Sequence, residues 1–147
     1  MVELIKNYSE WYGLKYEVCY FYNVYGKNHI SEGDYATVIG IFEKQYKEGK
    51  ALTVVGDGKQ SRQFTYIDDI VNALDKVRKR DSNKEWYLSS DVGYKIIDVA
   101  KMFTDNIEFI SERKGERYNA ITIQNDTKKI LNWQIKNNLK DYVNGTK

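Results

Sequence analysis

Hydrophobic positions along the chain follow two patterns, one typical of helices and one typical of buried strands. Near the start of the chain, five apolar side chains recur at helical spacing: Leu4, Ile5, Tyr8, Trp11 and Tyr12. This spacing predicts an amphipathic helix over Val2–Tyr12 that ends at Gly13. By contrast, residues 16–25 are almost continuously apolar and aromatic, and Gly26 follows them. They predict a central parallel strand buried on both faces.

The rest of the chain alternates between these two patterns. Asp34 is suited to cap a helix that continues through Tyr46 and ends at Gly49, and Asp68 is suited to cap a helix that continues through Val77. The remaining predicted elements are strands at Leu52–Val55, 64–67, 86–88 and Ile107–Ile110, and helices at Ile96–Phe103, 126–131 and 139–143. Alternating strands and helices predict the α/β class. No repeat or linker divides residues 1–147, so we expect a single domain.

Composition narrows the range of partners. The 23 basic and 21 acidic residues give a net charge of +2, which argues against a nucleic-acid binder. No apolar run is long enough to span a bilayer, so no membrane partner is expected. The first residues lack the apolar core of a secretion signal and Cys19 has no second cysteine, which together predict a cytoplasmic protein. His29 is the only histidine, and no metal site is expected.

The segment from Val55 to Asp69, VGDGKQSRQFTYIDD, combines a glycine turn, an arginine and the start of a helix. Together with three other segments it resembles the second half of the nucleotide-sugar epimerases and dehydratases, a branch of the extended short-chain dehydrogenases that includes UDP-glucose 4-epimerase. The other three segments are FYNVYG from Phe21, DYATVIGIF from Asp34 and ERKGERYNA from Glu112. Their order and spacing match over nearly the whole chain.

The resemblance implies an NAD-dependent enzyme whose first half supplies a glycine-rich dinucleotide turn and a Y-x-x-x-K pair. Neither stands at the corresponding place in this sequence, and by resemblance Met1 falls a few residues after the lysine. We therefore expect a C-terminal, substrate-binding portion that lacks the dinucleotide-binding half, has no catalytic residue of its own and binds no NAD alone.

The resemblance also assigns binding residues. A planar guanidinium can make paired hydrogen bonds to a diphosphate, and Arg62 and Arg113 match the family positions that hold this group. Glu116 matches a ribose-binding acid, Asn23 an asparagine that reaches the phosphates or sugar, and Val55 the strand beside the base. Phe21 and Tyr22 are the candidate contacts to the cofactor.

Other interpretations of these residues stay open. An arginine after a turn is often a solvated surface charge, residues 112–117 fit a charged loop, and Asn23 fits a strand end. The chain also departs from the family pattern: Tyr20 replaces an arginine, Lys27 replaces a proline, Gln63 replaces the aspartate of an R-D-F triplet, and residues 89–91 replace a glycine-rich turn. Losing that aspartate predicts a more loosely held Arg62.

Two functional hypotheses follow. The first is the UDP-sugar-binding half of an NAD-dependent epimerase or dehydratase, inactive alone and acting with a separate dinucleotide-binding half. The alternative is a binding module or genomic remnant without enzymatic role. Because the strands at 16–25 and 86–88 would belong to a larger sheet, we also expect exposed edges and self-association.

Overall fold

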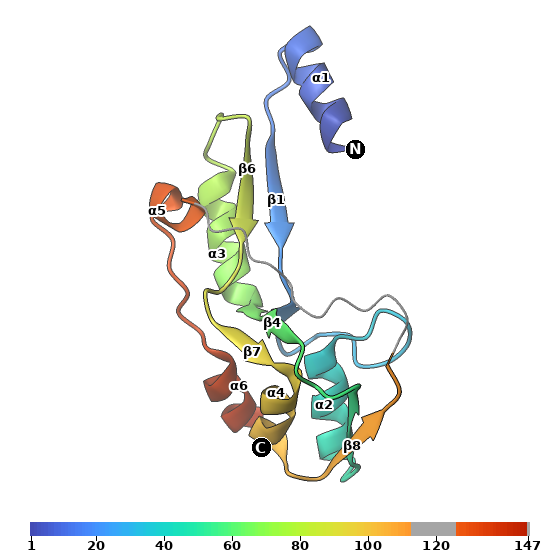
Figure 1. Ribbon diagram of the computed structural model, residues 1–147. Coiled ribbons are helices and arrows are strands. Elements are labelled where there is room, and N and C mark those ends of the chain that lie inside the picture. The colour runs from blue at the N-terminus through green and yellow to red at the C-terminus, as the bar shows by residue number, and fades with distance from the viewer. Residues whose placement is uncertain (113–125, 147) are drawn as a thin grey trace.

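The computed structural model describes residues 1–112 and 126–146 and has the α/β architecture that the sequence predicts (Figure 1). Its described strands form four two-stranded pairs, three of them parallel and one antiparallel. Helices pack against these pairs and enclose two hydrophobic clusters.

The first cluster lies between one face of a parallel strand pair and a helix. Strand β1 (Glu17–Phe21) pairs in parallel with β6 (Lys84–Leu88), and Cys19 lies opposite Trp86. Helix α3 (Ile67–Val77) and the short helix α5 (Thr127–Leu131) cover this face (Figure 1). The buried side chains of the cluster are Ile70, Ala73, Val77, Trp86, Leu88, Leu131 and Trp133.

The second cluster surrounds the parallel pair β3 (Leu52–Val55) and β8 (Ile107–Ile110). Helices α2 (Val38–Lys47), α4 (Ile96–Phe103) and α6 (Leu139–Thr146) contribute its apolar faces. Phe42 and Phe103 meet edge to face with their ring centroids 6.3 Å apart, a favourable aromatic geometry.

Two further strand pairs complete the described strands. Strand β2 (Val24–Tyr25) pairs in parallel with β5 (Thr65–Tyr66), and β4 (Ser61–Gln63) pairs antiparallel with β7 (Gly93–Lys95). The hydrophobic pattern of the sequence does not predict β4 or β7. Both are three residues long and polar, so neither carries an apolar alternation that would reveal a strand.

The predicted continuous strand over residues 16–25 is wrong in its extent and burial. Asn23 adopts a left-handed backbone with φ 39°, which no extended strand accommodates, and it divides the run into β1 and β2. The residues of β1 are half-buried, and Phe21 at its end is exposed. Within the described residues β1 pairs with β6 along one edge.

Both predicted aspartate caps are also wrong. Helix α2 begins after Thr37, whose hydroxyl accepts a hydrogen bond from the Gly40 amide at 3.1 Å, so Asp34 lies in the preceding loop. Helix α3 begins at Ile67, which places Asp68 in its first turn, near the positive end of the helix dipole. Asp69 is buried and accepts hydrogen bonds from the Lys136 and Asn137 amides, both at 3.1 Å.

Helix α1 (Val2–Tyr12) has the predicted bounds and lies apart from both clusters (Figure 1). No residue of α1 is buried, and its aromatic rings pack mainly on one another, with Tyr8 and Tyr12 5.3 Å apart. Its described links to β6 and the preceding loop are an ion pair from Lys6 to Glu85 at 3.0 Å and a hydrogen bond from Asn83 to Ser9. Among the described helices, none has the length and apolar character required to cross a membrane.

Candidate functional site

The candidate site lies where the chain leaves the carboxyl end of β1. Ligands of open parallel sheets bind beyond this end of the strands. Phe21 is the last residue of β1 and lies opposite Leu88, Tyr22 follows it, and Asn23 turns the chain into β2. The Phe21 side chain is 51% exposed, although phenylalanine is usually buried. The three adjacent candidates therefore share one edge of the fold.

A rigid glycine turn leads from β3 toward Arg62. Gly56 and Gly58 have φ of 60° and 67°, a region that favours glycine. A Cβ on Gly58 would lie 2.7 Å from the Val54 side chain, so space as well as conformation requires glycine there. The first amides of α4 then fix the turn, because Ile97 donates to the Gly58 carbonyl and Ile96 to the Gln60 carbonyl, both at 3.0 Å.

Arg62 lies in the middle of β4, opposite Tyr94 of β7. Its guanidinium donates from Nη1 to the Ser61 carbonyl at 2.9 Å and from Nη2 to Oε1 of Gln60 at 3.0 Å. Arginine and glutamine two residues apart in an extended segment project to the same side, which explains their contact. Gln60 thus gives the guanidinium a neutral partner in the strand where the family pattern has an aspartate at position 63, and the looser hold that the replacement predicts stays a prediction.

Asn23 is hydrogen-bonded to the backbone of the strand that carries Arg62. The Asn23 side chain donates from Nδ2 to the carbonyl oxygen of Gln63 at 2.9 Å, and its backbone carbonyl accepts from the Thr65 amide at 3.3 Å. The structure thus joins the end of β1 to the strand that carries Arg62, although 40 positions separate Asn23 and Gln63. Asn23 also performs the structural role that the alternative interpretation assigns to it.

The remaining candidates lie at or beyond the ends of β3 and β8. Val55 is the last residue of β3, is half-buried and lies opposite Ile110. Glu112 approaches the glycine turn, because a Cβ on Gly56 would lie 2.8 Å from its Cγ. Arg113 and Glu116 lie outside the described residues, so their assignment to the diphosphate and ribose stays a prediction.

Sequence reasoning missed Gln60 and Glu112 as parts of this site. The spacing of Gln60 and Arg62 is a local signal that could have shown the first contact. The approach of Glu112 to Gly56 depends on the pairing of β3 with β8, which no local pattern shows. In the described part of the chain, no group of three or more His, Cys, Asp and Glu residues is placed to hold a metal ion.

Tyr20, which stands where the resemblance predicts arginine, contributes to packing on β6. Its ring stacks on Tyr87 at 5.0 Å, and its hydroxyl donates to Glu85 at 3.1 Å. Desolvation and the neighbouring Glu85 carboxylate raise the pKa of Tyr20, so the hydroxyl stays protonated as this donor. The residue consequently supplies no positive charge to the site.

The fold is that of an α/β protein in which Asn23, at the carboxyl end of β1, is hydrogen-bonded to the strand that carries Arg62. The family model for the NAD dependent epimerase/dehydratase family matches residues 1–88, and the chain belongs to this family.

Relatives of known name agree with this assignment. The putative UDP-glucose 4-epimerase of Methanocaldococcus jannaschii is 26% identical over 161 residues, which cover 92% of this chain and 51% of the relative. The crystal structure of a UDP-glucose 4-epimerase from Thermotoga maritima with UDP-glucose has a TM-score of 0.90 and 25% identity, and the match covers 99% of this chain and 48% of that one.

A third comparison shows the fold together with a bound cofactor. The UDP-glucuronic acid 4-epimerase of Bacillus cereus, solved with UDP-glucuronic acid and NAD, has a TM-score of 0.84 at 21% identity, over 97% of this chain and 47% of that one. The chain spans about half the length of these relatives.

Proposed function

We propose that this chain binds the nucleotide part of a nucleotide-sugar, UDP-linked in the first instance. Combined with a dinucleotide-binding half, it forms an NAD-dependent epimerase or dehydratase. The observation that carries the proposal is that Gln60 is hydrogen-bonded to the Arg62 guanidinium and that Asn23 is bonded to the same strand. A guanidinium held in this way meets a diphosphate without losing further rotamer freedom on binding.

The other candidate residues are assigned roles that follow from their positions in the fold or in the sequence. Val55, at the end of β3, lies beside the base, and Arg113 and Glu116 bind the diphosphate and ribose from the segment that follows Glu112. Phe21 and Tyr22 form the wall on the side of the dinucleotide. The exposure of the Phe21 ring supports this role, since a partner surface would bury it.

Gly56 and Gly58 do not fit the pyrophosphate of NAD. Gly56 and Gly58 connect β3 to β4, whereas a dinucleotide turn connects a strand to the N-terminus of a helix. NAD bound by the other half would supply the hydride-transfer chemistry. The residues of this chain then bind and orient the nucleotide-sugar and exclude water from it.

The unpaired edge of β1 supports a separate dinucleotide-binding half as partner. Among the described strands, β1 has a neighbour on one edge, and Tyr20 and Tyr87 form an aromatic surface on the face opposite α3. An added strand would satisfy the backbone groups of the free edge, and a covering helix would bury the aromatic surface.

Reconstitution tests the proposal. The full chain is mixed with the purified dinucleotide-binding half of a relative, NAD and UDP-glucose, and product is followed by chromatography. We expect turnover that Arg62→Ala reduces at least about tenfold and Arg78→Ala leaves unchanged, since Arg78 is an exposed partner of Asp75. Lack of turnover in a folded, associated pair would contradict the enzymatic role.

A binding module without enzymatic role is the alternative. The replacement of an expected arginine by Tyr20, whose hydroxyl and ring are engaged with β6, favours it. UDP binding that depends on Arg62, without turnover in the reconstituted pair, would support this alternative over the enzyme.

A further inference from the structure

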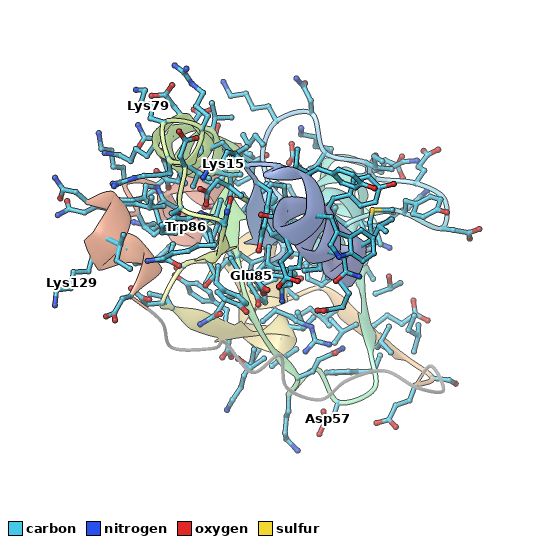
Figure 2. The ribbon with its side chains drawn as sticks, turned by 90° about the horizontal axis from the view of Figure 1, so that it is seen from above. Lys15, Asp57, Lys79, Glu85, Trp86 and Lys129 are labelled. Atoms are coloured by element: carbon cyan, nitrogen blue, oxygen red, sulfur yellow. The ribbon has the colours of Figure 1, made fainter. Side chains whose placement is uncertain are left out.

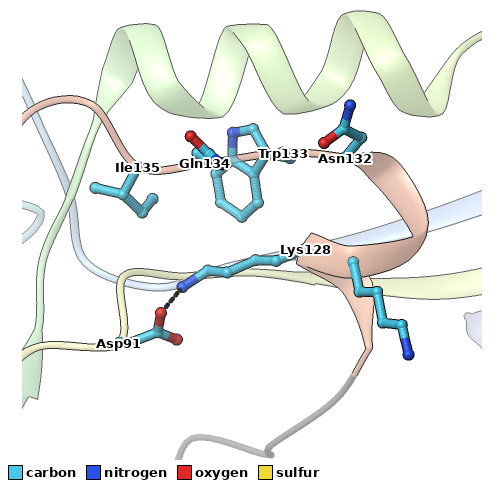
Figure 3. Close-up of a pocket in the computed structure, with 7 residues that line it drawn as sticks. Asp91, Lys128, Asn132, Trp133, Gln134 and Ile135 are labelled. Carbon is cyan, nitrogen blue, oxygen red and sulfur yellow. Dashed lines mark ion pairs between the residues drawn. The ribbon is translucent and has the colours of Figure 1, made fainter.

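An open pocket of about 530 Å³ lies between helix α5, the segment that follows it and the loop after β6 (Figure 3). The residues that determine its chemistry are Asp91, Lys128, Lys129, Asn132 and Trp133. Arg62 and Asn23 are not among the residues that line it. The pocket therefore differs from the candidate nucleotide-sugar site.

Lys128 gives the pocket its chemical character. Its Nζ atom has no contact with solvent and lies 5.9 Å from the centroid of the Trp133 ring, within reach of a cation–π interaction. Oδ2 of Asp91 lies 2.5 Å from this nitrogen and forms its ion pair (Figure 3). Among the described residues, however, no acceptor makes a hydrogen bond of regular geometry with this ammonium.

The Asp91 carboxylate, which pairs with Lys128, is poorly shielded from solvent. The Asp91 side chain is 83% exposed, whereas that of Lys128 is 27% exposed. Water competes strongly for an exposed carboxylate, so such a pair contributes little stability. The ammonium has three N–H donors and, among the described residues, a single carboxylate oxygen as partner, which leaves donors for an additional oxygen ligand.

The walls of the pocket are fixed before any ligand binds. Thr127 accepts a hydrogen bond from the Tyr87 amide at 3.2 Å, which ties the start of α5 to β6. The Trp133 amide donates to the Lys128 carbonyl at 2.9 Å, and its indole donates to the Asp69 carbonyl at 2.9 Å. Since Trp133 is also buried, the floor beneath Lys128 needs no rearrangement to receive a ligand.

We propose that this pocket is a binding site for a small oxyanion, the phosphate or carboxylate group of a ligand. The oxyanion displaces the Asp91 carboxylate and accepts hydrogen bonds from the Lys128 ammonium. Lys129 adds a second positive charge to the lining, and Asn132 adds an amide. The site is independent of the proposed nucleotide-sugar binding.

Titration of the full chain with inorganic phosphate, and separately with acetate, tests the proposal by ¹H–¹⁵N NMR. The Trp133 indole and the amides of residues 128–133 are the reporters. We expect saturable shifts confined to these signals. Lys128→Met keeps an aliphatic stem against Trp133 and should weaken binding at least about tenfold. Asp91→Asn should strengthen it about fivefold, because a competing charge is removed.

Matched variants separate the site from general charge effects. Lys79→Met removes an exposed lysine of another surface, and Asp105→Asn raises the net charge as Asp91→Asn does. Both should leave the dissociation constant unchanged. The relative affinities for phosphate and acetate identify which oxyanion the site prefers. Shifts that do not saturate, or equal effects of Asp91→Asn and Asp105→Asn, would overturn the proposal even if Lys128→Met failed to fold.

Discussion

Replacing Glu17 by alanine should loosen the strand pair from which the candidate site extends. Its carboxylate, on β1, accepts hydrogen bonds from the Ser82 amide at 2.6 Å, the Ser82 hydroxyl at 2.9 Å and the Trp86 indole at 2.6 Å. Trp86 belongs to the first hydrophobic cluster and lies beside Glu85 on β6, near the centre of the view in Figure 2. Glu17 thus connects the start of β1 to β6 and to the loop before it.

The expected loss follows from the groups that remain without an acceptor. Trp86 is 2% exposed, so water cannot readily replace the carboxylate at its indole. A hydrogen bond to a charged group contributes about 1.5–3 kcal/mol, whereas water can replace the acceptor for Ser82 at the rim. We therefore expect Glu17→Ala to lower the free energy of unfolding by about 2–3 kcal/mol. Glu17→Gln, which keeps one acceptor oxygen, should lower it by about 1 kcal/mol.

Urea unfolding measures this loss, followed by far-ultraviolet circular dichroism and by indole fluorescence. Glu10→Ala, which removes an exposed carboxylate from α1, is the matched control and should leave the unfolding midpoint unchanged. A loss below about 0.5 kcal/mol for Glu17→Ala would refute the assigned role, because such a value is typical of surface substitutions.

The pH dependence of this loss gives a second test. Burial opposes ionisation of Glu17, but the hydrogen bonds from Ser82, Trp86 and Lys84 outweigh it and lower the pKa of the carboxyl from its usual 4.5. The stabilisation is therefore complete above about pH 4.5 and is lost as the pH falls through the lower folded-state pKa. The difference between the wild type and Glu17→Gln should shrink over that range.

Three further predictions concern other parts of the fold. Gly58→Ala should cost about 1–3 kcal/mol more than Gly33→Ala in urea unfolding, because both glycines have positive φ but only the Gly58 Cβ would meet neighbouring atoms; equal losses would contradict this. Burial lowers the pKa of His29 by more than the neighbouring Glu43 carboxylate raises it. The free energy of unfolding should therefore fall as the pH drops below 6.5, and this fall should be smaller in His29→Gln. Sedimentation of the isolated chain should show self-association, and a monomer at high concentration would contradict it.

Hydrophobic periodicity correctly predicted the elements that carry a clear apolar pattern of their own. The bounds of α1, α4, β3 and β8 are those expected, because each has an apolar pattern that local propensity and burial both favour. Strands β4 and β7 gave no such signal, since their pairing joins Arg62 to Tyr94 across a long segment of chain. The aspartate caps failed for a different reason: Thr37 accepts from the Gly40 amide and caps α2 in place of Asp34, and α3 begins one residue before Asp68.

The candidate site could be predicted in part. The resemblance identified Arg62 and Asn23 from their places in short motifs, and in the structure Asn23 bonds the Gln63 carbonyl of the strand that carries Arg62. That hydrogen bond depends on the left-handed backbone at Asn23, a conformation that asparagine permits but does not require. The contact of Gln60 with Arg62 was not predicted, because a glutamine two residues from an arginine has many other possible partners in a folded chain.

Calorimetric titration of UDP into the full chain tests the central claim most directly. We expect saturable binding that Arg62→Ala weakens at least about tenfold, through loss of charge-assisted hydrogen bonds to the diphosphate. Arg78→Ala, which removes the same charge from the surface of α3, should leave the dissociation constant unchanged. Equal affinities of the Arg62→Ala and Arg78→Ala variants would contradict the assignment of Arg62 to the diphosphate.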